Sequence, residues 1–180
     1  MTICIALFRA INVGGRNMVA MAALKEMFAA AGFPQARSLL QSGNIVFGGG
    51  AREAGALESL IETETEKRLG LRADCFVRTA DEWGEILAHN PFARQAKADP
   101  GRLIIMALKS APGAAQLKAL RAAIVGRESV ELWKRHAYVY FPDGSGNSKL
   151  TPRLIEGKLE TRATGRNWNT ALKLQALAAT

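Results

Sequence analysis

The order of apolar segments in the first 80 residues is the feature that most constrains how this chain folds. Residues 3–8 form a continuous apolar run, which is typical of a strand buried on both faces. Residues 21–31 repeat apolar side chains at spacings of three and four, which predicts an amphipathic helix. Residues 38–47 are typical of a hairpin, 51–69 of a second helix and 73–78 of a short strand. This order of elements predicts a ferredoxin-like, or split βαβ, unit.

The second half of the chain predicts a similar unit with a less regular pattern. Strands are expected at residues 102–108, 130–133 and 138–141, and helices at 81–89, 112–124, 151–157 and 167–178. Residues 93–101 contain Pro and Gly without periodicity, which predicts a loop. No clear last strand precedes the final helix. We therefore predict an α+β fold with two ferredoxin-like subdomains, 1–80 and 81–180, in which helices pack on one face of mainly antiparallel sheets and the second subdomain carries a C-terminal helix.

The composition is that of a globular protein with a basic surface. Hydrophobic residues make up 48% of the chain and charged residues 22%, both in the ordinary range. The net charge is +8, with 9 Lys/Arg and 7 Asp/Glu in residues 1–80, and 15 and 9 in residues 81–180. Such a surface attracts anions. It is explained either by ordinary solvation or by a polyanionic partner such as nucleic acid.

Several classes of site are disfavoured by the residue types present. Cys4 and Cys75 are the only cysteines, too few for a disulfide scaffold, and both are predicted to be buried thiols. His89 and His136 lack second ligands at metal-binding spacing, so no metal and no cofactor is expected. The N-terminal apolar run has no basic leader and is far shorter than the roughly 20 residues of a membrane span. A cytoplasmic protein without a membrane partner is expected, and its oligomeric state is left open.

Three polar segments, residues 9–17, 41–44 and 166–170, contain the candidate binding site. They are rich in hydrogen-bond donors and contain no His or carboxylate, so no catalytic residue is predicted. Ser42 lacks the outer glycines of a nucleophile elbow, and residues 144–150 fail the phosphate-loop pattern. The candidate ligand-binding residues are Arg9, Asn12, Gly14, Gly15, Arg16, Gln41, Ser42, Asn44, Arg166 and Asn169.

The first of these segments has two alternative interpretations. Backbone N–H groups at Gly14 and Gly15, between Arg9 and Arg16, are suited to a phosphate or carboxylate. Alternatively, this is a tight strand-to-helix turn whose polar side chains bond the protein's own carbonyls. In both cases we expect it to meet residues 41–44 across adjacent strand ends.

In the third segment, Asn167 is expected to cap the final helix and Trp168 to anchor it in the core. The role of Arg166 is left open.

Residues 134–141 partly match a pattern of RNA-binding sheets. Arg135 replaces the required glycine, and His136 stands at the first stacking position. Side chains on one face of such a sheet can stack bases. Lys134, His136 and Tyr138 are therefore a secondary candidate for a nucleic-acid site. The alternative is that these aromatic side chains cover one side of a half-buried strand.

Taken together, the polar segments resemble an uncharacterised bacterial family, the DUF1697 proteins. The matching residues are 7–15, 41–47, 90–92 and 166–170. The resemblance spans nearly the whole chain, but the family usually has Gly where Ala10 stands and Pro where Ala20 stands. It implies a pair of ferredoxin-like α+β subdomains. It brings no established activity, substrate or cofactor.

The sequence favours a non-catalytic cytoplasmic binding protein whose Gly/Asn/Arg turns hold an anionic partner, either nucleic acid or a phosphate-bearing molecule. Whether the protein is an enzyme is left open. An enzyme acting on a small phosphorylated or carboxylated substrate would use the arginines to stabilise developing negative charge. A third possibility is that the motifs are purely structural. Convergence of their polar groups on an open cleft would favour a site, whereas burial with every group paired would favour a structural role.

Overall fold

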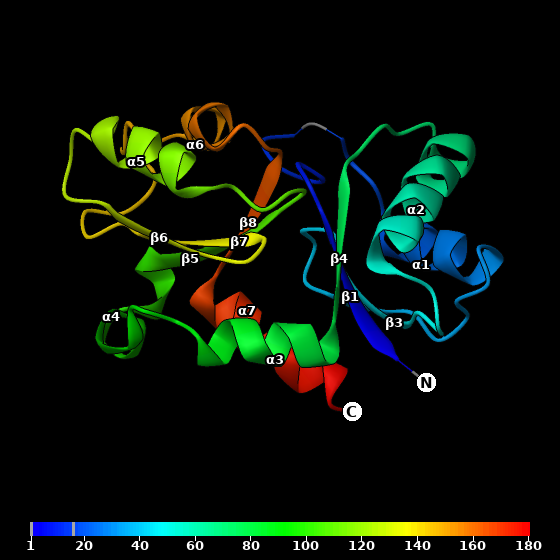
Figure 1. Ribbon diagram of the computed structural model, residues 1–180. Coiled ribbons are helices and arrows are strands. Elements are labelled where there is room, and N and C mark those ends of the chain that lie inside the picture. Colours follow the sequence, from blue (N-terminus) through cyan, green and yellow to red (C-terminus); the bar gives the residue numbers. More distant parts are fainter. Residues whose placement is uncertain (1, 16) are drawn as a thin grey trace. The chain divides into compact units, whose positions relative to one another are not determined.

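The computed structural model describes residues 2–15 and 17–180, which form two four-stranded antiparallel sheets with helices packed against them (Figure 1). The α+β prediction is confirmed. By its internal contacts the chain divides into a first unit, residues 1–85 with 173–180, and a second unit, residues 86–172.

The first unit has the predicted order of elements. They are β1 (Ile3–Phe8), α1 (Met21–Ala30), β2 (Arg37–Leu39), β3 (Asn44–Gly48), α2 (Ala54–Leu69) and β4 (Cys75–Thr79). The strand order is β2-β3-β1-β4, with every pair antiparallel. The apolar run of β1 is therefore a central strand, and the arrangement is the ferredoxin-like one.

The core of the first unit contains a cluster of phenylalanines. Helix α1 buries Met21, Leu24, Met27 and Phe28. The Phe28 ring lies 5.2 Å from the Phe47 ring of β3, and Phe33, just after α1, lies 4.9 Å from Phe47. Both contacts are edge-to-face, the arrangement that aromatic rings prefer. These contacts hold α1 against the same sheet that α2 covers (Figure 1).

The second unit repeats this connectivity. Its elements are β5 (Leu103–Leu108), α5 (Ala114–Ala122), β6 (Ser129–Trp133), β7 (His136–Tyr140), α6 (Pro152–Leu159) and β8 (Ala163–Asn167), and its sheet order is β6-β7-β5-β8. Strand β8 is absent from the prediction because Ala-Thr-Gly-Arg-Asn has no apolar alternation. It is an edge strand paired only with β5, and a Cβ at Gly165 would meet Ile104 Cγ2 at 2.9 Å.

Two further elements differ from the prediction. Helix α4 (Ala93–Ala98) and the 3₁₀ turn Pro100–Arg102 replace the expected loop, because Ala, Gln and Lys favour a helix even where no apolar stripe is present. Helix α6 begins at the Thr151 cap, as predicted, but continues through Gly157 and ends at the left-handed Glu160.

The observed units differ from the predicted boundaries 1–80 and 81–180 because the divisions fall inside two helices, α3 (Ala80–Ala88) and α7 (Trp168–Ala178). The end of α7 belongs to the first unit. There the Arg37 guanidinium donates to the carbonyl of Leu177 at 2.8 Å and to the hydroxyl of Thr180 at 2.6 Å. A boundary inside a continuous helix produces no shift in composition and no breaker, so the sequence contains no signal for it.

Strand β4 contains a buried arginine that the sequence analysis did not identify. Arg78 is fully buried, and its guanidinium lies 3.4 Å from the Glu58 carboxylate of α2 and 3.5 Å from the Glu82 carboxylate of α3. It also donates to the carbonyl of Val77 at 2.8 Å. The same Glu58 oxygen accepts the backbone N–H of Val77 at 2.9 Å. This network connects α2, β4 and the start of α3.

Candidate functional site

The side chain of Asn12 stabilises the turn after β1. Its amide nitrogen donates to the carbonyls of Val19 and Gln41 at 2.9 and 2.8 Å, and its oxygen accepts the N–H of Val19 at 2.7 Å. The contact with Gln41 confirms that the first two polar segments meet. Because three hydrogen bonds to the backbone already use this amide, its role is structural.

The same turn contains several residues in the left-handed region. Positive φ angles occur at Ala10 (56°), Asn12 (54°), Gly14 (61°), Gly15 (73°) and Asn17 (50°). Only glycine adopts this region freely, so Ala10 is strained by roughly 1 kcal/mol. The space around the Cβ positions of both glycines is open, and both residues are exposed.

Of the two arginines of this turn, the structure describes Arg9, which lies close to a carboxylate. The Arg9 guanidinium lies 3.8 Å from the Asp74 carboxylate, and its backbone N–H donates to the carbonyl of Asp74 at 2.9 Å. The neighbouring carboxylate weakens its attraction for an external anion. Arg16 lies outside the described residues.

The side chain of Asn44 also has a structural role. Asn44 is fully buried, and its amide donates to the carbonyl of Leu39 at 3.0 Å and to the hydroxyl of Ser42 at 2.9 Å. The carbonyl of Gly43 accepts the N–H of Phe8 at 2.9 Å. The side chain of Gln41 is exposed. The amides of Asn12 and Asn44 therefore bond groups of the turns themselves, which favours the structural interpretation of these two residues over ligand binding.

Substituting Asn12 with alanine is expected to lower the free energy of unfolding by about 1–3 kcal/mol, because the Val19 N–H and two carbonyls lose their partners. Gln41→Ala is the matched control. It keeps the backbone carbonyl that Asn12 bonds, so a change within about 0.5 kcal/mol is expected. Equilibrium unfolding in urea measures both. Equal losses for the two variants would contradict a structural role for Asn12.

The third polar segment belongs to the second unit. Arg166, on β8, donates to the hydroxyl of Thr164 at 2.9 Å and to the carbonyl of Gly165 at 2.8 Å. The Asn167 side chain accepts the N–H of Thr170 at 2.9 Å, which confirms the predicted helix cap. Trp168 is half-buried and Asn169 is exposed.

The predicted RNA-binding strand is covered within the second unit. His136 and Tyr138 have no exposed surface, and the Tyr138 hydroxyl donates to the carbonyl of Ile86 at 2.6 Å. Burial raises the pKa of the Tyr138 phenol. On the same face the His89 ring stacks on Trp133 with ring centres 4.2 Å apart. The base-stacking prediction is therefore wrong, because the segment after residue 86 occupies the sheet face that bases would need.

Lys134, the third residue of that prediction, is exposed in the turn between β6 and β7. Its ammonium group lies 4.3 Å from the centre of the Trp133 ring, within the range of a cation–π contact. Lys134 thus remains accessible, but His136 and Tyr138, the two aromatic side chains predicted to stack bases beside it, are buried.

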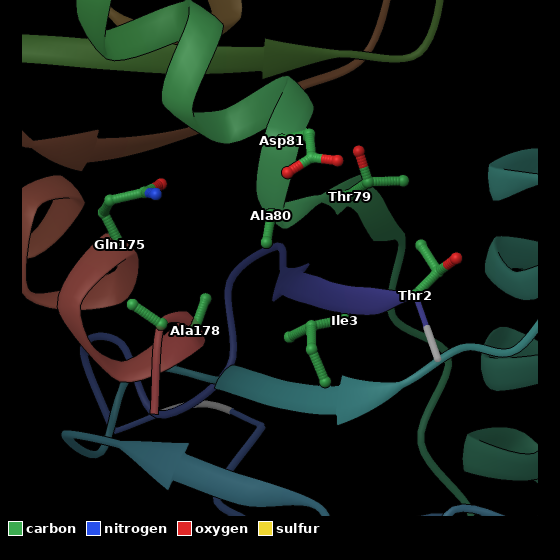
Figure 2. Close-up of a pocket in the computed structure, with 8 residues that line it drawn as sticks. Thr2, Ile3, Thr79, Ala80, Asp81, Gln175 and Ala178 are labelled. Atoms are coloured by element: carbon green, nitrogen blue, oxygen red, sulfur yellow. The ribbon is translucent and has the colours of Figure 1, made fainter.

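A hollow of about 480 Å³ in the first unit is lined by the start of β1, the end of β4, the start of α3 and the end of α7. Figure 2 shows Asp81 and Gln175 on two sides of it. The side-chain oxygen of Gln175 is buried and accepts no hydrogen bond from the described residues. The Asp81 carboxylate is negative, and the unsatisfied atom of Gln175 is a hydrogen-bond acceptor, so this hollow is poorly suited to an anion.

A pocket of about 370 Å³ in the second unit brings together residues from two segments of the family resemblance, 90–92 and 166–170. Asn90 follows α3, and Trp168 and Asn169 begin α7; all three line the pocket, together with Lys97 of α4. Asn90 belongs to residues 90–92, and Trp168 and Asn169 belong to residues 166–170. Asn169 is the only ligand candidate from the sequence analysis among the residues that line this pocket. Asn90 occurs in the sequence analysis within residues 90–92 of the family resemblance and was not a ligand candidate.

The orientation of Asn90 in this pocket is defined by a local turn. Its side-chain oxygen accepts the N–H of Phe92 at 2.9 Å, across Pro91. Its amide nitrogen is buried and finds no hydrogen-bond acceptor among residues 2–15 and 17–180. A buried polar group without a partner costs about 1–3 kcal/mol. Asn90 is therefore both oriented and incompletely satisfied.

A third hollow, of about 460 Å³, lies on α6 and is lined by Arg153 and Lys158 together with Thr151, Leu154 and Gly157. Gly157 has no side chain, and no heavy atom lies within 4 Å of its Cβ position. Arg153 and Lys158 are exposed and form no ion pair with the part of the chain that the structure describes. The hollow is therefore positively charged.

The observed units separate the charges more sharply than the predicted halves. The second unit contains 14 Lys/Arg and 6 Asp/Glu, whereas the first contains 10 of each. The net charge of +8 therefore belongs entirely to residues 86–172.

The described residues contain no group of three or more His, Cys, Asp or Glu side chains that could hold a metal ion. Among the helices of the described residues, none combines the length and the apolarity needed to cross a bilayer.

These features define a protein built from two ferredoxin-like units, each with its own hollows. The fold is similar to the conserved bacterial protein SP0830 from Streptococcus pneumoniae, with a TM-score of 0.76, 20% identity and 98% of each chain covered. At this identity the likeness shows the fold alone. The family model "Protein of unknown function (DUF1697)" matches residues 1–138, so the chain belongs to the DUF1697 family. No curated protein matches it.

Proposed function

We propose that the protein is a non-catalytic binding protein whose second unit holds a phosphate-bearing partner. The observation that carries this proposal is the location of the whole net charge of +8 in residues 86–172. A surface with such an excess of cations concentrates anions near it. The turns of the first unit contribute less, because the amides of Asn12 and Asn44 bond the protein's own backbone.

Of the three hollows described above, the one on α6 is best suited to a phosphate group, because two of its lining residues are cations and none is acidic. Arg153 and Lys158 bring two cations to one concave surface, and Gly157 leaves its floor free of a side chain. Arginine and lysine contacts supply most of the affinity of proteins for phosphate backbones. Lys149, exposed in the loop before α6, adds a further positive charge.

A cytoplasmic location is part of this proposal. Cys4 and Cys75 are free thiols and both are buried. Burial raises the pKa of the Cys4 thiol, which disfavours its reactive thiolate form. Unpaired cysteines are typical of a reducing compartment.

Binding to a mixed-sequence single-stranded oligonucleotide is expected to weaken linearly with salt on a log–log scale. Fluorescence anisotropy between about 50 and 200 mM salt measures the slope, which is about −0.7 for each phosphate contacted. The double variant Arg153→Gln/Lys158→Gln removes two contacts, so the slope is expected to become shallower by about 1.4.

The matched control is Lys25→Gln/Lys173→Gln, which removes the same charge from exposed positions of the first unit. Its slope is expected to stay near that of the unchanged protein. A slope near zero, or equal changes in both double variants, would contradict nucleic-acid binding at α6. Inorganic pyrophosphate tests a small phosphate ligand separately. It is expected to shift the amide NMR signals of residues 151–158, and no shift would contradict a phosphate site there.

A further inference from the structure

We infer that the pocket formed by Asn90, Lys97, Trp168 and Asn169 binds a planar ring with amide-type hydrogen-bonding groups on its edge, which is the chemistry of a nucleobase. This site is separate from the hollow on α6, because the two share no lining residue. The inference therefore goes beyond the proposed binding of phosphate and can fail independently of it.

The walls of the pocket are suited to the faces of a ring. Trp168 is half-buried at the first position of α7, directly after the Asn167 cap that fixes the start of the helix. Leu172, one turn later, also lines the pocket, although 46% of its surface is exposed. An indole and an exposed leucine beside one hollow provide an apolar surface on which a flat ring can stack.

The polar groups of the pocket are suited to the edge of such a ring. A carboxamide presents a donor and an acceptor side by side, which is how asparagine recognises the edges of bases. The oxygen of Asn90 is already bonded to the N–H of Phe92, so its remaining capacity is the buried amide nitrogen. A small shift that brought a ring carbonyl to this nitrogen would satisfy it. Asn169 is exposed, and its side chain forms no hydrogen bond with the part of the chain that the structure describes, so both of its groups can bond a ligand.

The size and charge of the pocket limit how large its ligand can be and how much negative charge it can carry. A volume of about 370 Å³ lies at the small end of the usual range for ligand pockets, roughly 300–1,000 Å³. It has room for a nucleoside rather than a dinucleotide. Lys97 is the single charged residue of the lining and is exposed, so a nucleoside with one phosphate is also accepted.

The test is titration of the full chain with adenosine, guanosine, cytidine and uridine, followed by calorimetry and saturation-transfer NMR. At least one nucleoside is expected to bind, with saturation transferred to its base protons. Asn169→Ala is expected to weaken binding on the order of tenfold through loss of hydrogen bonds. Trp168→Leu is expected to weaken it by about 5- to 150-fold through loss of stacking.

Asn147→Ala is the matched control, because Asn147 is an exposed asparagine of the same unit that does not line the pocket. Its affinity is expected to equal that of the unchanged protein. Asn169 is exposed, so its variant should retain the native circular dichroism even if Trp168→Leu does not fold. Two results would overturn the inference: no binding of any nucleoside at millimolar concentration, or equal affinity of the Asn169→Ala and Asn147→Ala variants. Comparing each nucleoside with its 5′-monophosphate then shows whether Lys97 contributes.

Discussion

Replacing Arg78 with methionine is expected to lower the free energy of unfolding by about 3–5 kcal/mol, the usual cost of breaking a buried ion pair by removing one partner. Arg78 is fully buried between the carboxylates of Glu58 and Glu82. Methionine fills much of the same volume but leaves Glu58, itself only 6% exposed, without its cation. Equilibrium unfolding in urea, followed by circular dichroism, measures the loss.

Arg68→Met is the matched control for this substitution. Arg68 also forms an ion pair, with Glu64 one helical turn away, but on the exposed face of α2. Exposed pairs of this kind contribute about 0.3–0.5 kcal/mol. Combining Arg78→Met with Glu58→Gln is expected to recover part of the loss, because the orphaned charge is removed. A cost for Arg78→Met no larger than that for Arg68→Met would show that the buried network does not stabilise the fold.

The pattern of apolar residues predicts most of the fold because each unit depends on a few strongly patterned elements. The run of residues 3–8 is buried on both faces, and it lies between β3 and β4 as a central strand must. Strand β8 shows the limit of this reasoning. Its residues Ala163–Asn167 are held by backbone hydrogen bonds to β5, which do not depend on side-chain type and therefore cannot be read from composition.

Buried charge and covered surfaces are harder to predict, since they depend on contacts between distant segments. Arg78 comes directly after the apolar residues of β4 and is indistinguishable in sequence from an arginine at a solvated strand end. Its partner Glu58 lies 20 residues earlier, on another element. The error at His136 and Tyr138 has the same origin. A strand pattern shows which side chains share a face, but not that the segment after residue 86 covers that face.

Individual residues of the candidate site could be predicted from the sequence, but not all of the contacts that bring them together. Asn12 follows the end of β1, and Gln41 precedes the start of β3, which pairs antiparallel with β1, so their contact follows from the sheet order. Asn90 and Asn169 are nearly 80 residues apart and lie on segments outside the sheet pattern, and only the fold brings them to one pocket. Asn169 was a ligand candidate from the sequence, whereas Asn90 was not.

Replacing Gly43 with alanine is expected to lower the free energy of unfolding by about 2–5 kcal/mol. Gly43 has a φ of 69°, and an alanine Cβ there would lie 2.8 Å from the Cβ of Phe8, closer than such atoms approach in proteins. The left-handed conformation costs about 1–2 kcal/mol and the overpacking about 1–3 kcal/mol. Phe8 is fully buried and its N–H donates to the carbonyl of Gly43, so neither partner can move without disturbing the end of β1.

Gly50→Ala separates these two contributions. Gly50 has nearly the same φ, 68°, but no heavy atom lies within 4 Å of its Cβ position. Its substitution should therefore cost only the backbone term of about 1–2 kcal/mol, measured by the same urea unfolding. If the two variants lose equal stability, the contact between Gly43 and Phe8 does not constrain the turn. If Gly43→Ala alone loses the larger amount, close packing between Gly43 and Phe8 limits this position to glycine. The glycine of the second polar segment then has a structural explanation that requires no ligand.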